Sequence, residues 1–242
     1  MKFEDCINKI ICADCLDLMK DWPDKCIGLI CTDFPYNIKL GKNQHYHRRL
    51  DSHPAIYWDN MSDEKYTTFI SGKVNEFLRV AECLILTCGN GNQHLYPKPK
   101  WTLSWVKMNA LTISTLTRGQ KICKSCWEPV LVYGQLDNPP MFDVINCPIS
   151  VQPDAEGHPV PKPLKLFRQF VGFKNTDIVC DPMCGSGTTC VAAKILGRRY
   201  IGIDISPEYC KIAEERLKAV DTGVPVKEAR KGQGALFSVE SI

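Results

Sequence analysis

A glycine-rich turn between a strand and a helix holds the residues best suited to chemistry. The segment Asp181–Thr189 reads Asp-Pro-Met-Cys-Gly-Ser-Gly-Thr-Thr, follows an apolar strand pattern at 177–180 and opens a helical pattern at 188–196. Glycine at positions 185 and 187 permits a sharp turn and lets backbone approach a ligand where a Cβ would clash. The pattern predicts a ligand-binding turn, with a plain strand-to-helix connection as the alternative.

Asp204 adds a carboxylate at the tip of the next predicted strand, Tyr200–Ile205. A carboxylate in that place can accept both hydroxyls of a ribose, so the two features together predict a nucleoside pocket. A triphosphate-binding P-loop is disfavoured because no lysine stands between Gly187 and Thr188.

A second group of chemically capable residues follows the apolar run Ile27–Cys31. It reads Thr32-Asp-Phe-Pro-Tyr-Asn37. Pro35 has a fixed φ and pushes Phe34 into an extended conformation, which holds the Phe34 carbonyl beside the Asp33 carboxylate. These two acceptors could face one amino group, and the Tyr36 ring could stack on a planar base, which is worth about 1–3 kcal/mol. The alternative is a tight turn with a buried aromatic ring.

Both segments resemble motifs of one enzyme family. Asp33-Phe-Pro-Tyr36 resembles the Asp-Pro-Pro-Tyr catalytic motif of amino-group DNA methyltransferases, and Asp181–Thr189 is similar to their motif for S-adenosylmethionine. Cys12–Met19 and His158–Leu164 are similar to further segments of that family, so the resemblance spans nearly the whole chain. A catalytic motif that precedes the cofactor motif is typical of the circularly permuted β group.

The resemblance implies a role for each matched residue. The catalytic set is Asp33, Phe34, Pro35 and Tyr36. Asp14 is similar to a carboxylate near the cofactor adenine, and His158 and Lys162 to the segment that lines the methionine moiety, with Lys162 a partner for its carboxylate. The full expected cofactor set is Asp14, Cys15, Asp33, His158, Lys162, Asp181, Met183, Cys184, Gly185, Ser186, Gly187, Thr188 and Asp204.

Two positions depart from the family pattern. Phe34 replaces the first proline of the tetrapeptide, which we expect to keep the carbonyl geometry and to loosen the loop slightly. Met183 replaces a phenylalanine that lines the cofactor pocket, and its polarizable thioether can fill that space.

The implied reaction is transfer of a methyl group from S-adenosylmethionine to the N6 amino group of an adenine flipped out of DNA. Aspartate at position 33 is usual in adenine-N6 enzymes, whereas cytosine-N4 enzymes commonly carry serine there. Three alternatives stay open: cytosine-N4 methylation, RNA methylation, and a noncatalytic DNA-binding subunit.

Net charge of +3 is too small to indicate nucleic-acid binding by itself. A basic stretch directly after Tyr36 is a candidate DNA-contacting loop, and a second, less distinct basic region lies at 98–124 with two tryptophans. The first comprises Lys39, Lys42, His45, His47, Arg48 and Arg49.

The chain contains 14 cysteines, most of them within apolar segments, where they are expected to be reduced small hydrophobes. Cys12 with Cys15 and Cys123 with Cys126 have metal-like spacing, but a structural zinc would require both pairs to meet. We therefore expect no metal.

Length and pattern indicate one α/β domain with mainly parallel strand pairing. The resemblance implies a Rossmann-like, seven-stranded, circularly permuted methyltransferase sheet, mostly parallel with an antiparallel edge hairpin. The catalytic domain is expected at 1–222, with a catalytic half at about 1–137, a cofactor half at about 155–222, target-recognition loops at about 39–60 and 89–126, and a loose tail at 223–242. With no signal peptide or membrane-span pattern, we expect a cytoplasmic protein of a bacterium or of a phage acting in its host, and a possible homodimer.

Overall fold

The computed structural model describes residues 1–37, 61–107, 125–149 and 162–230. Their strands form one eight-stranded sheet with the order β1-β8-β7-β2-β3-β5-β4-β6. The bounds are β1 Lys9–Cys12, β2 Ile27–Asp33, β3 Ala81–Thr87, β4 Trp101–Val106, β5 Trp127–Tyr133, β6 Val144–Asn146, β7 Ile178–Asp181 and β8 Arg199–Asp204.

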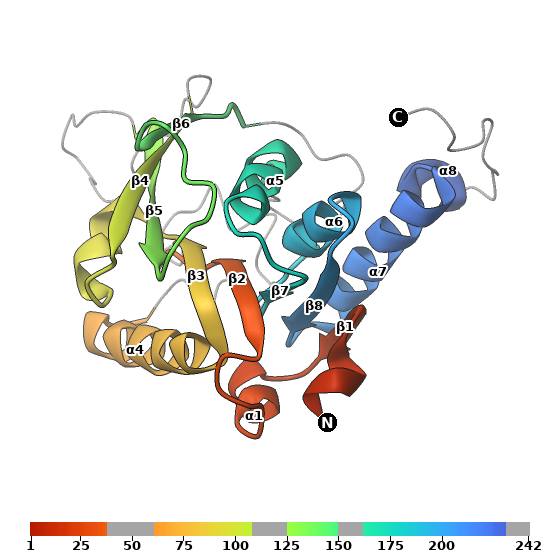
Figure 1. The fold of residues 1–242 in the computed structure, drawn as a ribbon, viewed down its shortest axis with the longest axis horizontal. Coiled ribbons are helices and arrows are strands. Elements are labelled where there is room, and N and C mark those ends of the chain that lie inside the picture. The colour runs from red at the N-terminus through yellow and green to blue at the C-terminus, as the bar shows by residue number, and fades with distance from the viewer. Residues whose placement is uncertain (38–60, 108–124, 150–161, 231–242) are drawn as a thin grey trace.

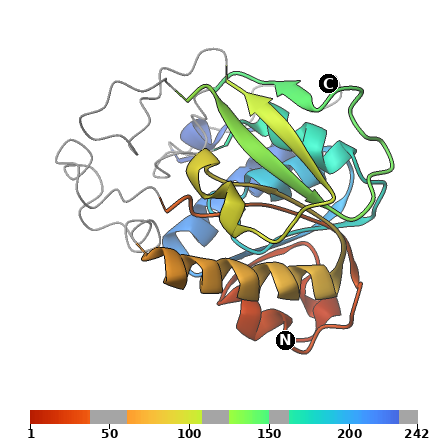
Figure 2. The ribbon, with the colours of Figure 1, turned by 90° about the vertical axis from the view of Figure 1, so that its left-hand side faces the viewer.

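Helices cover both faces of this sheet, as Figures 1 and 2 show. The α-helices are α1 Cys15–Met19, α4 Asp63–Val80, α5 Leu164–Gly172, α6 Thr188–Ile195, α7 Pro207–Thr222 and α8 Val226–Arg230, and two 3-10 helices are η1 Phe3–Cys6 and η3 Asn90–Leu95. Helices α1 and α4 pack on one face, and α5, α6 and α7 pack on the other.

Side chains along the central strands alternate between the two faces of the sheet, which divides the apolar core into two layers. In β3, Leu84 and Leu86 pack in the layer with α4, whereas Cys83 and Ile85 pack in the layer with α5 and α6. Successive side chains of a strand point to opposite faces, and a strand that is apolar on both faces must be covered twice. The continuous apolar runs of the sequence therefore become the centre of a three-layer sandwich.

The expected fold class is confirmed, with one more strand than the expected seven. Strands β1, β8, β7, β2 and β3 run parallel to one another, while β5 runs antiparallel to both β3 and β4. The additional strand is the short β6, which pairs parallel to β4 and covers the edge of the expected hairpin. No helix in the described part of the chain is long and apolar enough to cross a membrane.

The first part of the expected loose tail is ordered. Val224 and Val226 are buried, and α8 packs on α7, where Arg230 pairs with Glu215 at 2.6 Å. The sequence interpretation gave weight to the glycines and charges of this segment and missed the two valines that anchor it.

Candidate active site

The two sequence motifs lie side by side at one edge of the sheet. Strands β2 and β7 are parallel neighbours, so Asp33 at the end of β2 and Asp181 at the end of β7 share the carboxyl edge. A hydrogen bond joins the motifs directly: Thr32 Oγ1 donates to Asp181 Oδ1 at 2.7 Å. Thr189 Oγ1, in α6, donates to Asp181 Oδ2 at 2.6 Å. The bond from Thr32 thus joins two residues that are 149 positions apart in the chain.

The backbone of the tetrapeptide is held by bonds from three other segments. Phe34 N–H donates to Thr87 O at 3.2 Å. The Tyr66 hydroxyl donates to Pro35 O at 2.6 Å, and Asn92 Nδ2 donates to Tyr36 O at 2.7 Å. Since each of these contacts fixes a different peptide unit, the loop has little freedom to move.

Phe34 anchors this loop rather than loosening it. Its side chain is 1% exposed and makes edge-to-face contacts with Phe69, Phe77 and Tyr96 at centroid distances of 6.3, 6.1 and 5.6 Å. Aromatic pairs of this geometry contribute about 0.5–1.5 kcal/mol each beyond burial. The expectation of a looser loop was wrong because a phenylalanine here reaches the core beside α4.

Asp33 and Tyr36 belong to a cluster of charged side chains at this edge. Asp33 Oδ1 accepts a short hydrogen bond from Thr87 Oγ1 and lies 3.3 Å from Lys162 Nζ. Lys162 Nζ also donates to the Tyr36 hydroxyl at 2.6 Å and lies 4.4 Å from the centre of its ring. Among the described residues, both contacts of Asp33 fall on Oδ1, which leaves Oδ2 for another donor.

A second carboxylate, that of Glu128 at the start of β5, completes the cluster. Its Oε2 accepts from the Tyr36 hydroxyl at 2.5 Å and from Lys162 Nζ at 3.1 Å, and its Oε1 accepts from Lys107 Nζ at 2.5 Å. The ammonium groups of Lys107 and Lys162 each lie 5.3 Å from the Trp105 ring. Two carboxylates and two ammonium groups therefore balance one another.

Burial and neighbouring charges shift the pKa values in this cluster in opposite directions. Burial raises the pKa of Asp33, against the opposing effect of Lys162. Burial alone would also raise the pKa of Glu128, but Lys162 and Lys107 together hold it below its usual value. Burial raises the pKa of Tyr36, whose hydroxyl therefore stays protonated and donates. The cluster thus pairs the firmly ionised carboxylate of Glu128 with the more basic carboxylate of Asp33.

The glycine-rich turn is built as the sequence predicts. Gly185 and Gly187 have φ values of +49° and +78°, in the left-handed region that favours glycine. A Cβ on Gly187 would lie 2.7 Å from Ala213 Cβ, so only glycine lets α6 approach α7 here. Beneath the turn, the buried Arg216 donates to Ser186 O at 2.7 Å and to Thr188 Oγ1 at 3.0 Å.

Asp204 and Asp14 stand at the ends of neighbouring strands beside this turn. Asp204 Oδ2 accepts from Gly185 N–H at 2.8 Å, and its Oδ1 accepts from Ser206 N–H at 2.9 Å. Strand β1 pairs with β8 so that Cys12 lies opposite Asp204, which places Asp14 just beyond the same edge. Asp14 Oδ1 accepts from Leu16 N–H at 2.8 Å at the start of α1.

The remaining residues of the expected cofactor set do not all lie beside the glycine-rich turn with exposed side chains. The Cys15 thiol is buried and accepts from Lys73 Nζ at 3.1 Å, so its side chain faces the core. Cys184 is buried in the layer with α6, whereas Met183 packs partly exposed against the opposite layer. His158 lies outside the described residues.

Comparison with known proteins identifies the family. The DNA methylase family of N6/N4 type matches residues 96–215, which include Lys162, the glycine-rich turn and Asp204. The chain belongs to this family of amino-group DNA methyltransferases. The matched segment begins after the tetrapeptide, so the assignment is independent of Asp33–Tyr36.

Two relatives of this methyltransferase are type II methyltransferases. Type II methyltransferase M2.DpnII of Streptococcus pneumoniae is 35% identical over 131 residues, which are 52% of this chain and 49% of that protein. Type II methyltransferase M2.LlaDCHI of Lactococcus lactis subsp. cremoris is 26% identical over 237 residues, 86% of this chain and 88% of that protein. The chain therefore spans about half of the first relative and most of the second.

Two solved structures illustrate the likeness in fold. The PvuII DNA methyltransferase, described as cytosine-N4-specific, has a TM-score of 0.64 at 16% identity and covers 96% of this chain and 95% of its own. The M1.HpyAVI complex with SAM has a TM-score of 0.57 at 20% identity and covers 90% of this chain and 100% of its own. At these identities the likeness establishes the fold alone.

Glu128 and the burial of Lys107 are the site features that the sequence interpretation missed. Lys107 was grouped with a basic region, yet it is 4% exposed and bonded to Glu128, so it is no surface contact for DNA. An acidic residue two positions before an apolar run, in Trp127-Glu-Pro-Val130, was the available signal.

The expected DNA-contacting loop lies outside the described residues. That holds for Lys39, Lys42, His45, His47, Arg48 and Arg49. Cys123, which has metal-like spacing with Cys126, also lies outside the described residues. Within the described ranges, no three His, Cys, Asp or Glu side chains gather in a way that could hold a metal ion.

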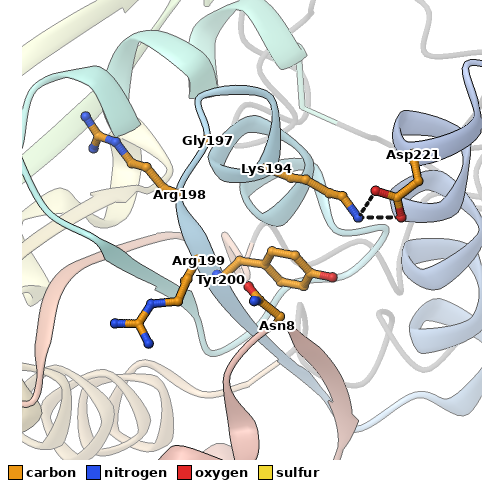
Figure 3. Close-up of a pocket in the computed structure, with 7 residues that line it drawn as sticks. All are labelled: Asn8, Lys194, Gly197, Arg198, Arg199, Tyr200 and Asp221. Carbon is orange, nitrogen blue, oxygen red and sulfur yellow. Dashed lines mark hydrogen bonds and ion pairs between the residues drawn. The ribbon is translucent and has the colours of Figure 1, made fainter. Parts of the chain in front are cut away.

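A depression on the opposite edge of the sheet, where β1 and β8 begin, carries several cations (Figure 3). Lys194 pairs with Asp221 at 2.6 Å, Arg199 pairs with Asp177, and Arg198 donates to Val171 O. Because each cation already binds a protein group, the depression offers no ready anion site. Its lining residues are Asn8, Lys194, Gly197, Arg198, Arg199, Tyr200 and Asp221.

Proposed function

We propose that this methyltransferase transfers a methyl group from S-adenosylmethionine to the N6 amino group of an adenine flipped out of DNA. The observation that carries the proposal is the bond from Thr32 to Asp181, which sets the tetrapeptide directly beside the glycine-rich turn. An amino group bound at Asp33 would then lie next to whatever the turn holds.

The residues at the turn suit the cofactor. Two glycines at positive φ bring backbone close to a ligand, and carboxylates at the ends of β8 and β1 can accept ribose hydroxyls and adenine donors. Asp204 uses one lone pair of each oxygen for backbone N–H groups and keeps others for a ligand. When bound, S-adenosylmethionine supplies an electrophilic sulfonium methyl group.

Asp33 is the group that would act on the target amine. Its Oδ2 can accept a hydrogen from the amino group, and the Phe34 carbonyl can accept the other. Because burial raises the pKa of Asp33, its carboxylate is also a competent acceptor for the proton that the methylated nitrogen must lose. Tyr36 is the candidate stacking partner for the flipped base, with Lys162 already over its ring. Positioning supplies most of the catalysis.

Aspartate at position 33 supports adenine over cytosine, as the family resemblance implies. An enzyme that acts on the DNA of a bacterium or of a phage in its host would work in the cytoplasm.

The test is transfer of labelled methyl to unmethylated genomic DNA, followed by nucleoside digestion and mass spectrometry. We expect N6-methyladenine. Asp33→Ala should abolish transfer while calorimetry shows cofactor binding largely retained, and Asp21→Ala, an exposed carboxylate in the loop before β2, is the matched control. N4-methylcytosine as the product would refute the adenine assignment, and full activity of Asp33→Ala would refute the catalytic assignment.

A further inference from the structure

Glu128 lies at the centre of the charged cluster and touches two groups of the proposed site. Its Oε2 accepts from the Tyr36 hydroxyl at 2.5 Å and from Lys162 Nζ at 3.1 Å. The Glu128 side chain is 14% exposed, so these contacts are largely shielded from water. On the far side, Lys107 Nζ bonds its Oε1 at 2.5 Å and offsets the cost of burying the charge.

Lys162 is shared between two carboxylates. Its Nζ lies 3.1 Å from Glu128 Oε2 and 3.3 Å from Asp33 Oδ1. Opposite charges attract strongly in a site of low dielectric, so without Glu128 the ammonium group would move onto Asp33. It would then occupy the oxygens that must accept hydrogens from the target amine. Glu128 thus keeps Asp33 available.

Glu128 also fixes the direction of the Tyr36 ring. Asn92 holds the Tyr36 carbonyl, but a backbone bond leaves the side chain free to rotate. The bonds of the Tyr36 hydroxyl to Glu128 and to Lys162 remove that freedom, and Glu128 also holds Lys162 in place. A stacking surface that is already ordered spares the bound base the cost of ordering it.

We propose that Glu128 is a positioning residue for methyl transfer, holding Lys162 away from Asp33 and the Tyr36 ring in its stacking orientation. This inference rests on the proposed function. Glu128 acts through its neighbours, so its loss should affect turnover and leave the cofactor pocket at the glycine-rich turn intact.

Glu128→Gln tests this because glutamine keeps the size and loses the charge. We expect kcat to fall at least about ten-fold while KM for S-adenosylmethionine stays within about two-fold. The acid limb of the kcat profile should move to lower pH, because the Glu128 charge raises the pKa of Asp33 and its removal lowers it. A purely structural role would reduce stability without moving that limb.

Two further variants serve as controls. Glu82→Gln removes a half-exposed carboxylate that lies 3.5 Å from Lys174, near the opposite end of β3, and should leave kcat unchanged. Glu128→Asp keeps the charge and should restore the position of the acid limb with part of the turnover. If Glu128→Gln does not fold, the double variant Glu128→Gln/Lys107→Met, which removes the opposing charge as well, takes its place.

The outcomes separate this inference from the proposed function. An active wild-type enzyme whose Glu128→Gln variant keeps kcat and its pH profile refutes the positioning role alone. A wild-type enzyme that binds the cofactor and methylates no DNA refutes the proposed function and this inference with it.

Discussion

Replacing Gly187 by alanine should destabilise the protein through two separable effects. Gly187 has φ +78° and ψ +23°, and a left-handed conformation costs a residue with a Cβ about 1–2 kcal/mol. The new Cβ would also lie 2.7 Å from Ala213 Cβ and 3.2 Å from Ala213 Cα. Overpacking of this kind costs about 1–3 kcal/mol. The total expected loss in the free energy of unfolding is about 2–5 kcal/mol.

Gly197 provides a matched control for the first effect. Its φ is +69°, and a Cβ built there meets nothing within 4 Å. Gly197→Ala should therefore lower the free energy of unfolding only by the conformational cost of about 1–2 kcal/mol. The difference between the two variants isolates the contact with α7.

Urea denaturation of both variants measures this difference, and the slope m should stay unchanged. Ala213→Gly in the Gly187→Ala background should recover part of the loss, less about 1 kcal/mol for glycine in a helix. Two results would refute the packing argument. One is an equal loss of unfolding free energy for Gly187→Ala and Gly197→Ala, and the other is a strictly additive loss for the double variant Gly187→Ala/Ala213→Gly.

Three further outcomes are expected. Burial raises the pKa of Asp181 from 3.8 to about 7, so between these pH values the native state binds more protons than the unfolded state. The free energy of unfolding therefore falls as pH rises, by at most about 1.4 kcal/mol per pH unit. Asp181→Asn should flatten the pH dependence of the urea midpoint over that range. Arg216→Met leaves Ser186 and Thr188 acceptors without their buried donor, and should cost about 1–3 kcal/mol and weaken cofactor binding in calorimetry. Gly72→Ala, in α4 with open space around the added Cβ, should raise the unfolding free energy by about 0.5–1 kcal/mol in the same denaturation assay.

The sequence predicted the parts of the site that follow from local pattern. Apolar runs ending in Asp33, Asp181 and Asp204 became parallel strands, and parallel strands present their carboxyl ends at one edge. Strand direction together with the adjacency of β2 and β7 in the sheet therefore accounts for the meeting of the two motifs. The glycines at 185 and 187 were informative because their conformations are ones that side chains rarely adopt.

Residues that act through tertiary contacts were not predictable in this way. The sequence placed Lys162 beside the methionine carboxylate of the cofactor, a role that stays a prediction, while the structure shows it in contact with Asp33, Tyr36 and Glu128. Lys162 stands just before α5, and no local pattern shows which side chains it meets there. Phe34 was treated as a replaced proline because the aromatic rings that surround it come from other segments, which no local pattern reveals.

The direction of β5 explains why Glu128 reaches the site at all. The register pairs Leu84 with Tyr133 and Thr87 with Val130, so the amino end of β5 lies at the carboxyl edge of β3. Were β5 parallel to β3, its apolar carboxyl end near Tyr133 would stand at that edge, and the residues before Pro129 would lie on the far side of the sheet. Reversal of one strand thus brings a carboxylate and, through the paired strand β4, the ammonium group of Lys107 to the edge that carries Asp33 and Tyr36. An antiparallel pair at the end of a parallel sheet is therefore part of the site's electrostatics, because without it Lys162 would have Asp33 as its only carboxylate partner among the described residues.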